Sequence, residues 1–413
     1  MTIAVTRMGA LFHYAIPRAV HRLGLLGRFY TDLWSGKSWG KLLEAIPAGL
    51  RTDSLKRLLG RHAEDLPSDL VTEFPTLAFS YGFKRRRARS ANEELRVHIN
   101  AGRRFCEHII GHGLRGCDGV YTTNSQGLEL LVYARQRGMR TLSEQTIAPY
   151  AFERALLAEE QSRFPGWEEP MELAREAVEA FAARERQEWA HCDRILCGSD
   201  FVRDAIRSVG GPAERCAVVP YGFDFPNQKS EIGNRKSGGR LRVLTVGTVC
   251  LRKGMPYVAQ AAETLRGQMT FRVVGPNRLL YAGLERLRSV VEFVGAVPRS
   301  EVGAHFQWAD VFLFPSLCEG SATVCYEALA AGLPVICTAN TGSVIRDGME
   351  GFLVPICDVA AIVARLRQLD GDRRLLAAMS EAALARCDFF SMKAYADRLK
   401  PVLTGALTAV IEQ

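Results

Sequence analysis

Two glutamates flank a turn of small residues in the segment FPSLCEGSATVCYEALAAGLPVICT. Glu319 stands at the start of the turn, and Glu327 lies in the apolar run that follows, which ends at the stop signals Gly332 and Pro334. The run before the turn predicts a buried strand and the run after it a helix. A carboxylate accepts paired hydrogen bonds, so the two acids are suited to binding two diols. A glutamate at a helix start more often complements the helix dipole, and the spacing alone leaves both interpretations open.

The turn itself consists of Gly320, Ser321 and Ala322, whose small side chains let the backbone approach a ligand closely. In an open parallel sheet, ligands bind at the carboxyl ends of strands, where the N–H groups and dipole of the next helix favour anions. We therefore expect a diphosphate against this turn. The glutamates should contact hydroxyl groups, because a carboxylate and a phosphate repel each other.

A second polar turn, Arg252-Lys253-Gly254 in VGTVCLRKGM, follows the apolar run LRVLTVG. Arginine can bind two phosphate oxygens at once, and lysine supplies a point charge. A basic turn taken alone is more often a solvated one. At the same sheet edge as the two glutamates, this turn is interpreted as a phosphate clamp.

The C-terminal half alternates between short apolar runs and segments with helical periodicity. Strands are predicted at residues 241–247, 270–275, 291–297, 310–316 and 333–338, and helices at 255–265, 279–290, 301–309, 321–332 and 359–369. Such alternation indicates βαβ units and a parallel sheet covered by helices on both faces.

The N-terminal half predicts a second, more decorated α/β domain. Its candidate strands are TIAVT, TLAFS, GVYTT, RTLSE and RILCGS, at residues 2–6, 76–80, 119–123, 140–144 and 194–199. A charged helix is expected over 154–192, with interruptions at Pro165 and Pro170, and an amphipathic one over 392–411.

A polar segment rich in Gly, Ser and Lys, from Phe225 to Arg240, predicts a linker between the two halves. We expect an N-terminal domain at 1–225, the linker at 226–240, a second α/β domain at 241–390, and a C-terminal helix at 391–413 that packs back on the first domain.

Length and composition set the broad class. At 413 residues, with 47% hydrophobic residues and a mean hydropathy of −0.03, the chain is long enough for two globular domains. No stretch of about 20 apolar residues predicts a membrane-spanning helix. The 11 cysteines include no CxxC pair, which favours reduced thiols in the cytoplasm. A net charge of +8 and a pI near 9.0 favour anionic partners.

The densest basic cluster is KRRRAR, from Lys84 to Arg89. It is interpreted as a solvated surface loop or as a contact with anionic lipid headgroups or a lipid-diphosphate acceptor. No aromatic residues are interleaved with the basic ones as in single-strand nucleic-acid binding, and we expect no nucleic-acid partner. The eight histidines show no metal-binding spacing.

The glutamates, ADVFLFPS before them, EALAAGLPVI after them and VG…KG upstream resemble the retaining GT-B glycosyltransferases of the family-4 type, also called glycosyl transferases group 1. CDRILCGSDFVRDAI, RCAVVPYGFD and GMEGFLVPICDVAAIVARL extend the resemblance in order from about residue 192 to 366. The resemblance implies a GT-B fold, with two Rossmann-like domains facing a central cleft.

The resemblance also assigns roles to residues. Lys253 would contact the donor diphosphate, Glu319 the hydroxyls of the donor sugar, and Glu327 those of the ribose. Backbone N–H groups would serve the sugar and the diphosphate at Gly320, Ser321, Ala322, Thr323 and Val324.

Three further positions carry over from the family's loops. The base would lie against the loops that contain Asn277 and Val297, and Gly9 would face the donor across the cleft.

Several residues differ from the family's usual pattern, and these differences bear on the identity of the donor more than on the class of reaction. Thr248 stands where the family usually has an arginine, whose charge Arg252 is expected to supply, and Ala322 replaces a glycine. No histidine ends the mid-domain strand, where Thr123, Asn124 and Ser125 stand instead. The residues considered in its place are His13, Glu144 and Gln145.

The resemblance implies transfer of a sugar, with retention, from a nucleotide-sugar to a glycan, glycolipid or small-molecule acceptor. No cofactor is expected, and no metal, because no DxD-like acid pair is found. Alternatives left open are a nucleotide-sugar epimerase or phosphorylase of the same fold, and a non-catalytic nucleotide-sugar-binding protein. The expected location is the cytoplasm, with peripheral contact to the inner face of the membrane.

Overall fold

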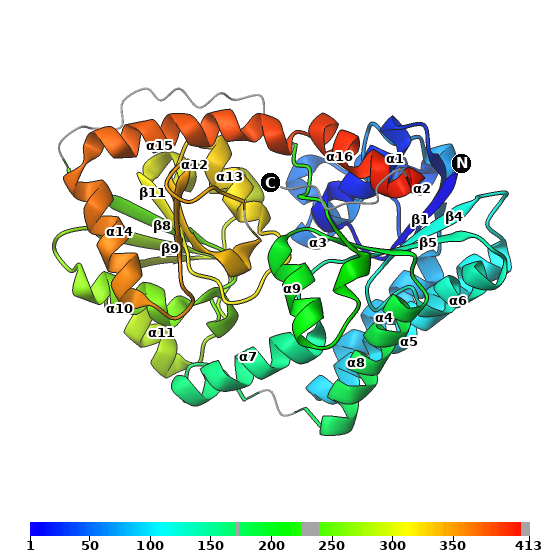
Figure 1. Ribbon diagram of the computed structural model, residues 1–413, viewed down its shortest axis with the longest axis horizontal. Coiled ribbons are helices and arrows are strands. Elements are labelled where there is room, and N and C mark those ends of the chain that lie inside the picture. The colour runs from blue at the N-terminus through cyan, green and yellow to red at the C-terminus, as the bar shows by residue number, and fades with distance from the viewer. Residues whose placement is uncertain (171–172, 225–238, 343, 406–413) are drawn as a thin grey trace.

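The computed structural model describes residues 1–170, 173–224, 239–342 and 344–405, which form two parallel sheets with helices on both faces (Figure 1). Most of the predicted linker, and the end of the predicted C-terminal helix, lie outside the described residues.

The N-terminal domain holds a sheet in the order β3-β2-β1-β4-β5-β6-β7. Its strands are β1 Ile3–Arg7, β2 Leu26–Thr31, β3 Val71–Glu73, β4 Gly119–Thr123, β5 Arg140–Gln145, β6 Arg194–Cys197 and β7 Cys216–Val218. Its helices are α1 Ala15–Arg22, α2 Ser38–Glu44, α3 Asp53–Leu59, α4 Pro75–Arg87, α5 Ala91–His112, α6 Leu128–Gln136, α7 Tyr150–Arg163, α8 Arg175–Ala190 and α9 Asp200–Ser208. The strands run parallel with a crossover at β1, the switch point beside which ligands bind.

The C-terminal domain holds a sheet in the order β10-β9-β8-β11-β12-β13. Its strands are β8 Arg242–Val246, β9 Thr270–Val274, β10 Glu292–Gly295, β11 Val311–Phe314, β12 Val335–Thr338 and β13 Gly351–Val354. Its helices are α10 Met255–Thr264, α11 Tyr281–Arg288, α12 Arg299–Trp308, α13 Thr323–Ala330, α14 Val359–Gly371 and α15 Arg373–Arg386. The sheet and its helices confirm the predicted GT-B architecture of two Rossmann-like domains.

One predicted strand is wrong. TLAFS, residues 76–80, lies inside helix α4, which begins at Pro75. Proline is well suited to the first helical position, and Leu77 is the buried residue of the helix. A short apolar run cannot by itself distinguish a strand from a helix. The run KRRRAR is consequently the last turn of α4 and the residues after it, not a loop.

A segment of the N-terminal half reaches into the C-terminal domain. We call residues 150–168, α7 and the turn after it, the α7 arm; in Figure 1 it crosses below both domains. Trp167, 6% exposed, belongs to the hydrophobic core of the C-terminal domain, and its carbonyl oxygen accepts a 2.7 Å hydrogen bond from the N–H of Leu280. Tyr257 of α10 donates its hydroxyl to the buried carboxylate of Glu160 at 2.7 and 2.8 Å. The arm therefore fastens the two domains together.

The chain returns to the N-terminal domain at its end. Helix α16, Met392–Thr404, packs against α1 and buries Tyr395, Leu399 and Leu403 in the core that contains β1. Among the described residues, no helix is both long and apolar enough to cross a membrane.

Candidate active site

A cavity of about 1160 Å³ lies between the two domains. Phe12, Thr146, Ile147, Phe223 and Asp224 line it from the N-terminal domain and the chain that leaves it. The loops after β8 and β11 and the helices α12 and α13 line it from the other side. The volume is of the size that holds a small-molecule ligand with several rings.

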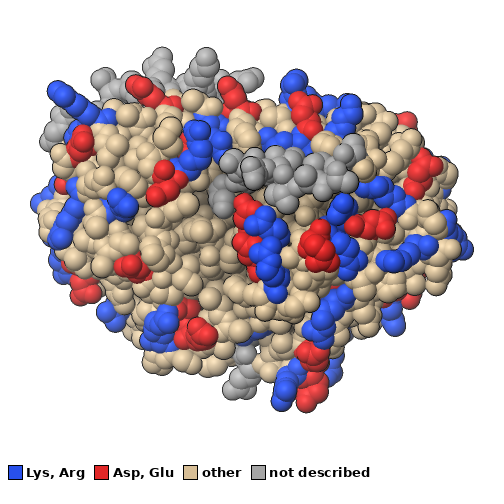
Figure 2. All heavy atoms as spheres, viewed as in Figure 1, with Lys and Arg blue, Asp and Glu red and all other residues tan. Residues whose placement is uncertain are grey.

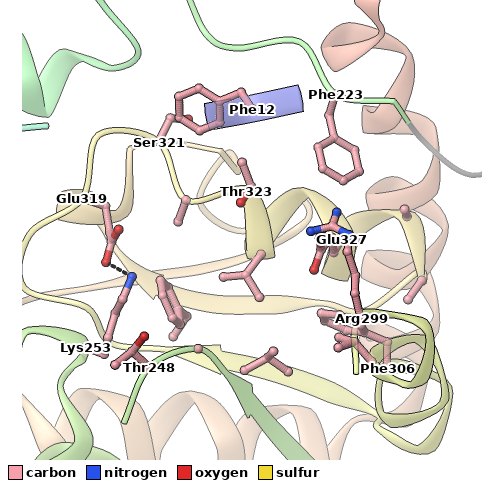
Figure 3. A pocket seen from close by; sticks show the side chains of 18 of the residues that line it. Phe12, Phe223, Thr248, Lys253, Arg299, Phe306, Glu319, Ser321, Thr323 and Glu327 are labelled. Atoms are coloured by element: carbon pink, nitrogen blue, oxygen red, sulfur yellow. Dashed lines mark hydrogen bonds and ion pairs between the residues drawn. The ribbon is translucent and has the colours of Figure 1, made fainter. Parts of the chain in front are cut away.

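Lys253 and Glu319 meet in this cavity. Lys253 belongs to a 3₁₀ turn, Leu251–Lys253, after β8, and Glu319 to the loop after the neighbouring strand β11. The ammonium forms an ion pair with Oε1 of Glu319, drawn as a dashed line in Figure 3. The hydroxyl of Ser316 donates a further hydrogen bond to the same oxygen at 2.7 Å. The ends of two adjacent parallel strands thus bring the predicted clamp and the predicted acid into contact.

The surroundings of Glu319 keep it ionised. The side chain is nearly enclosed, and burial alone would raise the pKa of its carboxyl. The charges of Lys253 and Arg252 outweigh burial and hold the pKa of Glu319 below its ordinary value. A buried, ionised carboxylate with one oxygen engaged by these groups is suited to accept hydrogen bonds from ligand hydroxyls.

Arg252 lines the same cavity but is also tied to the protein. It donates a 2.6 Å hydrogen bond from Nη1 to the carbonyl of Cys318, and Nη1 lies 3.3 Å from Glu319. Its Nε lies 3.6 Å from the carboxylate of Glu153 on the α7 arm. Glu168 of the same arm accepts the N–H of Leu251 at 2.7 Å, so the arm supports the turn that carries the two cations.

Helix α13 begins at the floor of the cavity. The residue before it, Ala322, makes no side-chain capping hydrogen bond, and Thr323 points into the cavity between the two glutamates (Figure 3). The residues predicted around this helix start all line the cavity: Gly320, Ser321, Ala322, Thr323 and Val324. A helix N-terminus beside Lys253 is an environment for an anion.

Glu327 occupies the far side of the cavity from Glu319, as Figure 3 shows. Arg299, at the start of α12, lies 3.3 Å from its carboxylate. Burial raises the pKa of Glu327, although Arg299 opposes that shift. The side chain of Glu327 is 24% exposed and lines the cavity, so its carboxylate can contact a ligand there.

The two domains touch at the turn itself. A side chain at Gly320 would place its Cβ 1.7 Å from the carbonyl oxygen of Thr146, so glycine is required here by the opposite domain and not by the turn's own backbone. The hydroxyl of Ser199 donates a 2.7 Å hydrogen bond to the carbonyl of Gly320. Thr146 in turn donates to the side chain of Asn124, which places one of the predicted cleft residues behind the contact.

Most of the predicted residues gather in the cavity: Glu319, Lys253, Arg252, Glu327, Val297, Thr248 and the helix-start residues named above. Two lie outside its lining. Asn277 is exposed and binds the backbone of Leu279, and the N–H of Gly9 donates to Asp32 at 2.8 Å.

Two of the residues considered in place of the family's histidine are enclosed in the N-terminal domain. Glu144 is 1% exposed and lies 3.4 Å from the guanidinium of Arg7, and Gln145 binds Glu185 and Trp189. His13 lies outside the cavity lining, while its neighbour Phe12 is part of it.

Sequence reasoning missed the contribution of aromatic and cationic residues to the cavity. Phe12 and Phe223 form its upper edge in Figure 3, and Arg299 and Phe306 its wall near Glu327. Phe12 stands in a short turn, Leu11–Tyr14, with a φ of +52° that glycine would normally supply, so no pattern pointed to it. Arg299 could have been found from the sequence, since it closely follows Val297, whose loop was expected to contact the nucleotide base.

Comparison with known proteins shows similarity in sequence and in fold. The family model of the Glycosyl transferases group 1 matches residues 240–372. Among curated relatives, the amylovoran biosynthesis glycosyltransferase AmsK of Erwinia amylovora is 30% identical over 209 residues, which are 45% of this chain and 50% of that protein. The chain spans about half the length of the first curated relatives that it matches.

Solved structures resemble the whole chain in fold. Sucrose-phosphate synthase from Thermosynechococcus elongatus has a TM-score of 0.64 at 17% identity, with 98% of this chain and 99% of that one covered. HepE of Anabaena in complex with UDP has a TM-score of 0.60 at 14% identity, with 98% and 100% covered. The segment 240–372, with Lys253, Glu319 and Glu327 at one cavity, matches the Glycosyl transferases group 1 model, and the whole chain has a GT-B fold.

Proposed function

We propose that this protein is a retaining glycosyltransferase that moves a sugar from a nucleotide-sugar donor to a glycan or lipid-linked acceptor. The observation that carries the proposal is the enclosed Lys253–Glu319 pair beside the N-terminus of α13, with Glu327 across the same cavity. A cation and a helix start suit a diphosphate, and two separate carboxylates suit two sets of hydroxyls.

In the proposed complex, the donor diphosphate binds the ammonium of Lys253 and accepts hydrogen bonds from the first backbone N–H groups of α13. The carboxylate of Glu319, released from its full pairing with Lys253, accepts hydrogen bonds from the sugar. Glu327 accepts those of the ribose, next to the exposed Arg299, and the base lies toward Val297. The structure of HepE in complex with UDP supports a nucleoside diphosphate as the ligand.

Catalysis is proposed to come from stabilising the leaving diphosphate. As the sugar–oxygen bond breaks, negative charge develops on the diphosphate beside Lys253, and positive charge develops on the sugar beside Glu319. The acceptor hydroxyl would attack from the face that the diphosphate leaves, which gives retention. Because Lys253 and α13 supply the compensating charge, we propose that no metal ion is required.

The acceptor side belongs to the N-terminal domain. The name of AmsK refers to biosynthesis of a polysaccharide, amylovoran, and supports a glycan acceptor. A lipid-linked acceptor would bring the protein to a membrane, where the basic run from Lys84 to Arg89 is proposed to make contact. All eleven cysteines are free thiols, which supports a location in the reducing cytoplasm. The membrane contact would then be with its inner face.

The first test identifies the donor. Melting temperatures are measured with a panel of UDP-, GDP- and ADP-sugars, because a ligand that binds the folded state raises the melting temperature. Glu327→Gln should lower the response to the best donor, and no response to any member of the panel would contradict the proposal.

The second test follows the product. NMR of the product from the best donor should show transfer with the anomeric configuration retained, at an unchanged rate in excess EDTA. Epimerised or phosphorolysed donor would establish one of the alternative enzymes instead, and binding without turnover would indicate a non-catalytic protein.

A further inference from the structure

Helix α4 leaves two large apolar side chains mostly exposed. Phe79 is 65% and Phe83 is 56% exposed, whereas Leu77, on the other side of the helix, is 3% exposed. Helix α4 packs against α5 on the outside of the N-terminal domain (Figure 1). One face of α4 is therefore anchored, and the face that carries both phenylalanines is presented to the surroundings.

Cationic side chains lie on the same face. At 3.6 residues per turn, an arc of about 100° contains both phenylalanines and two arginines. We define the α4 outer face as these side chains: Phe79, Phe83, Arg86 and Arg87. The guanidinium of Arg87 lies over the ring of Phe83, 4.3 Å from its centroid, so the cationic and apolar groups are in direct contact.

The protein neutralises only part of the positive charge at this helix end. Arg85 is paired with Glu94 at 2.7 Å, and Glu93 accepts the backbone N–H of Arg89. Within the described ranges, no carboxylate forms an ion pair with Lys84, Arg86 or Arg87. On the face of the molecule seen in Figure 2, acidic and basic side chains lie next to each other over much of the surface.

We propose that the α4 outer face docks the protein on a membrane surface that contains anionic lipid, with Phe79 and Phe83 entering between the headgroups. The cations would lie at the level of the lipid phosphates, while the rings reach the apolar layer below. A lipid surface needs no complementary groove, and the helix offers none. The docking would hold the cavity near a lipid-linked acceptor. This role of the docking rests on the proposed function, whereas membrane binding itself does not depend on it.

The test is co-sedimentation with vesicles of phosphatidylcholine alone or mixed with phosphatidylglycerol. The wild type should bind the mixed vesicles and bind them more weakly at high salt, because salt screens the charges. Each basic residue near an anionic membrane changes binding by about fivefold, so Arg86→Gln/Arg87→Gln should weaken it about 25-fold. Phe79→Ser/Phe83→Ser should also weaken binding, and this loss should remain at high salt.

The matched control removes two arginines from a helix of the other domain, Arg365→Gln/Arg367→Gln on α14. Arg365 also stacks on a phenylalanine, Phe352, at 4.4 Å, so the same kind of contact is lost at equal charge. This control should bind mixed vesicles within twofold of the wild type. Circular dichroism establishes that each variant is folded.

Three results would overturn the docking proposal: no binding of the wild type to mixed vesicles, unchanged binding of both α4 variants, or an equal loss in the α14 control. Binding of the α4 face to nucleic acid or protein, with no vesicle binding, would also overturn it. Transfer to a water-soluble acceptor should be the same in wild type and α4 variants, which separates failure of docking from failure of the proposed enzyme activity.

Discussion

Gly320→Ala is a small change that the structure predicts to be severe. The added Cβ would stand 1.7 Å from the carbonyl oxygen of Thr146, and contacts below 3.0 Å are essentially never found, so the turn and the opposite domain must separate by about 1.3 Å. That movement breaks the 2.7 Å hydrogen bond from Ser199 to Gly320 and shifts Glu319, the residue before Gly320. A displacement of about 1 Å at a reacting centre costs roughly 100-fold in rate, or about 3 kcal/mol in transition-state stabilisation.

The assay is the initial rate of donor consumption, expressed as kcat/KM, with the melting temperature measured in parallel. Gly303→Ala is the matched control: Gly303 lines the same cavity, yet a Cβ there meets nothing within 4 Å. Gly303 lies within α12, where alanine favours the helix by about 1 kcal/mol, so this variant should be slightly more stable and equally active. A Gly320→Ala enzyme within twofold of the wild type would refute the argument, as would an equal loss in both variants.

Three further changes test separate parts of the structure. Lys253→Met removes the ammonium opposite Glu319 and should lower donor turnover at least about 100-fold while the protein stays folded; near-normal turnover would exclude its role in stabilising the leaving group. Leu399→Ala, fully buried where α16 meets the N-terminal domain, should cost about 2–5 kcal/mol in urea denaturation, whereas the exposed neighbour Lys400→Ala should cost less than about 0.5 kcal/mol. Burial raises the pKa of Glu188 to about 7, so the folded protein binds this proton more tightly than the unfolded chain, and stability is lost as the pH rises from about 4.5 to 7. Relative to Glu188→Gln, the wild type should lose up to about 3 kcal/mol over that range in thermal denaturation; a difference that does not change with pH would show that Glu188 does not titrate there.

Most of the C-terminal sheet could be predicted because its central strands β8, β11 and β12 are buried on both faces and form continuous apolar runs. The predicted strand at 241–247 contains β8. Glu319 lies after strand β11 and Glu327 in helix α13, as the apolar runs around them predicted. In the N-terminal domain, short edge strands such as β3 and β7 give no such signal, and TLAFS satisfies both periodicities.

The pairing of residues across the cavity could not be read from the sequence. The contact of Gly320 with Thr146 joins positions that are far apart in the chain and unremarkable in type. Glu319 was expected to bind hydroxyls and Lys253 phosphate, but their contact with each other depends on the register of β8 beside β11. Local patterns specify elements, whereas the packing of one domain on the other specifies the site.

The α7 arm affects how such a chain can recombine with its relatives. A crossover in the polar segment near residue 230 would separate the two sheets, yet it would leave Trp167 and Glu160 with the wrong partner domain. A recipient C-terminal domain would then receive a foreign arm against Tyr257 and the turn of Arg252. N-terminal and C-terminal halves joined in this way should be inherited together, and grafting a new N-terminal half would require the native residues 150–168 to be retained.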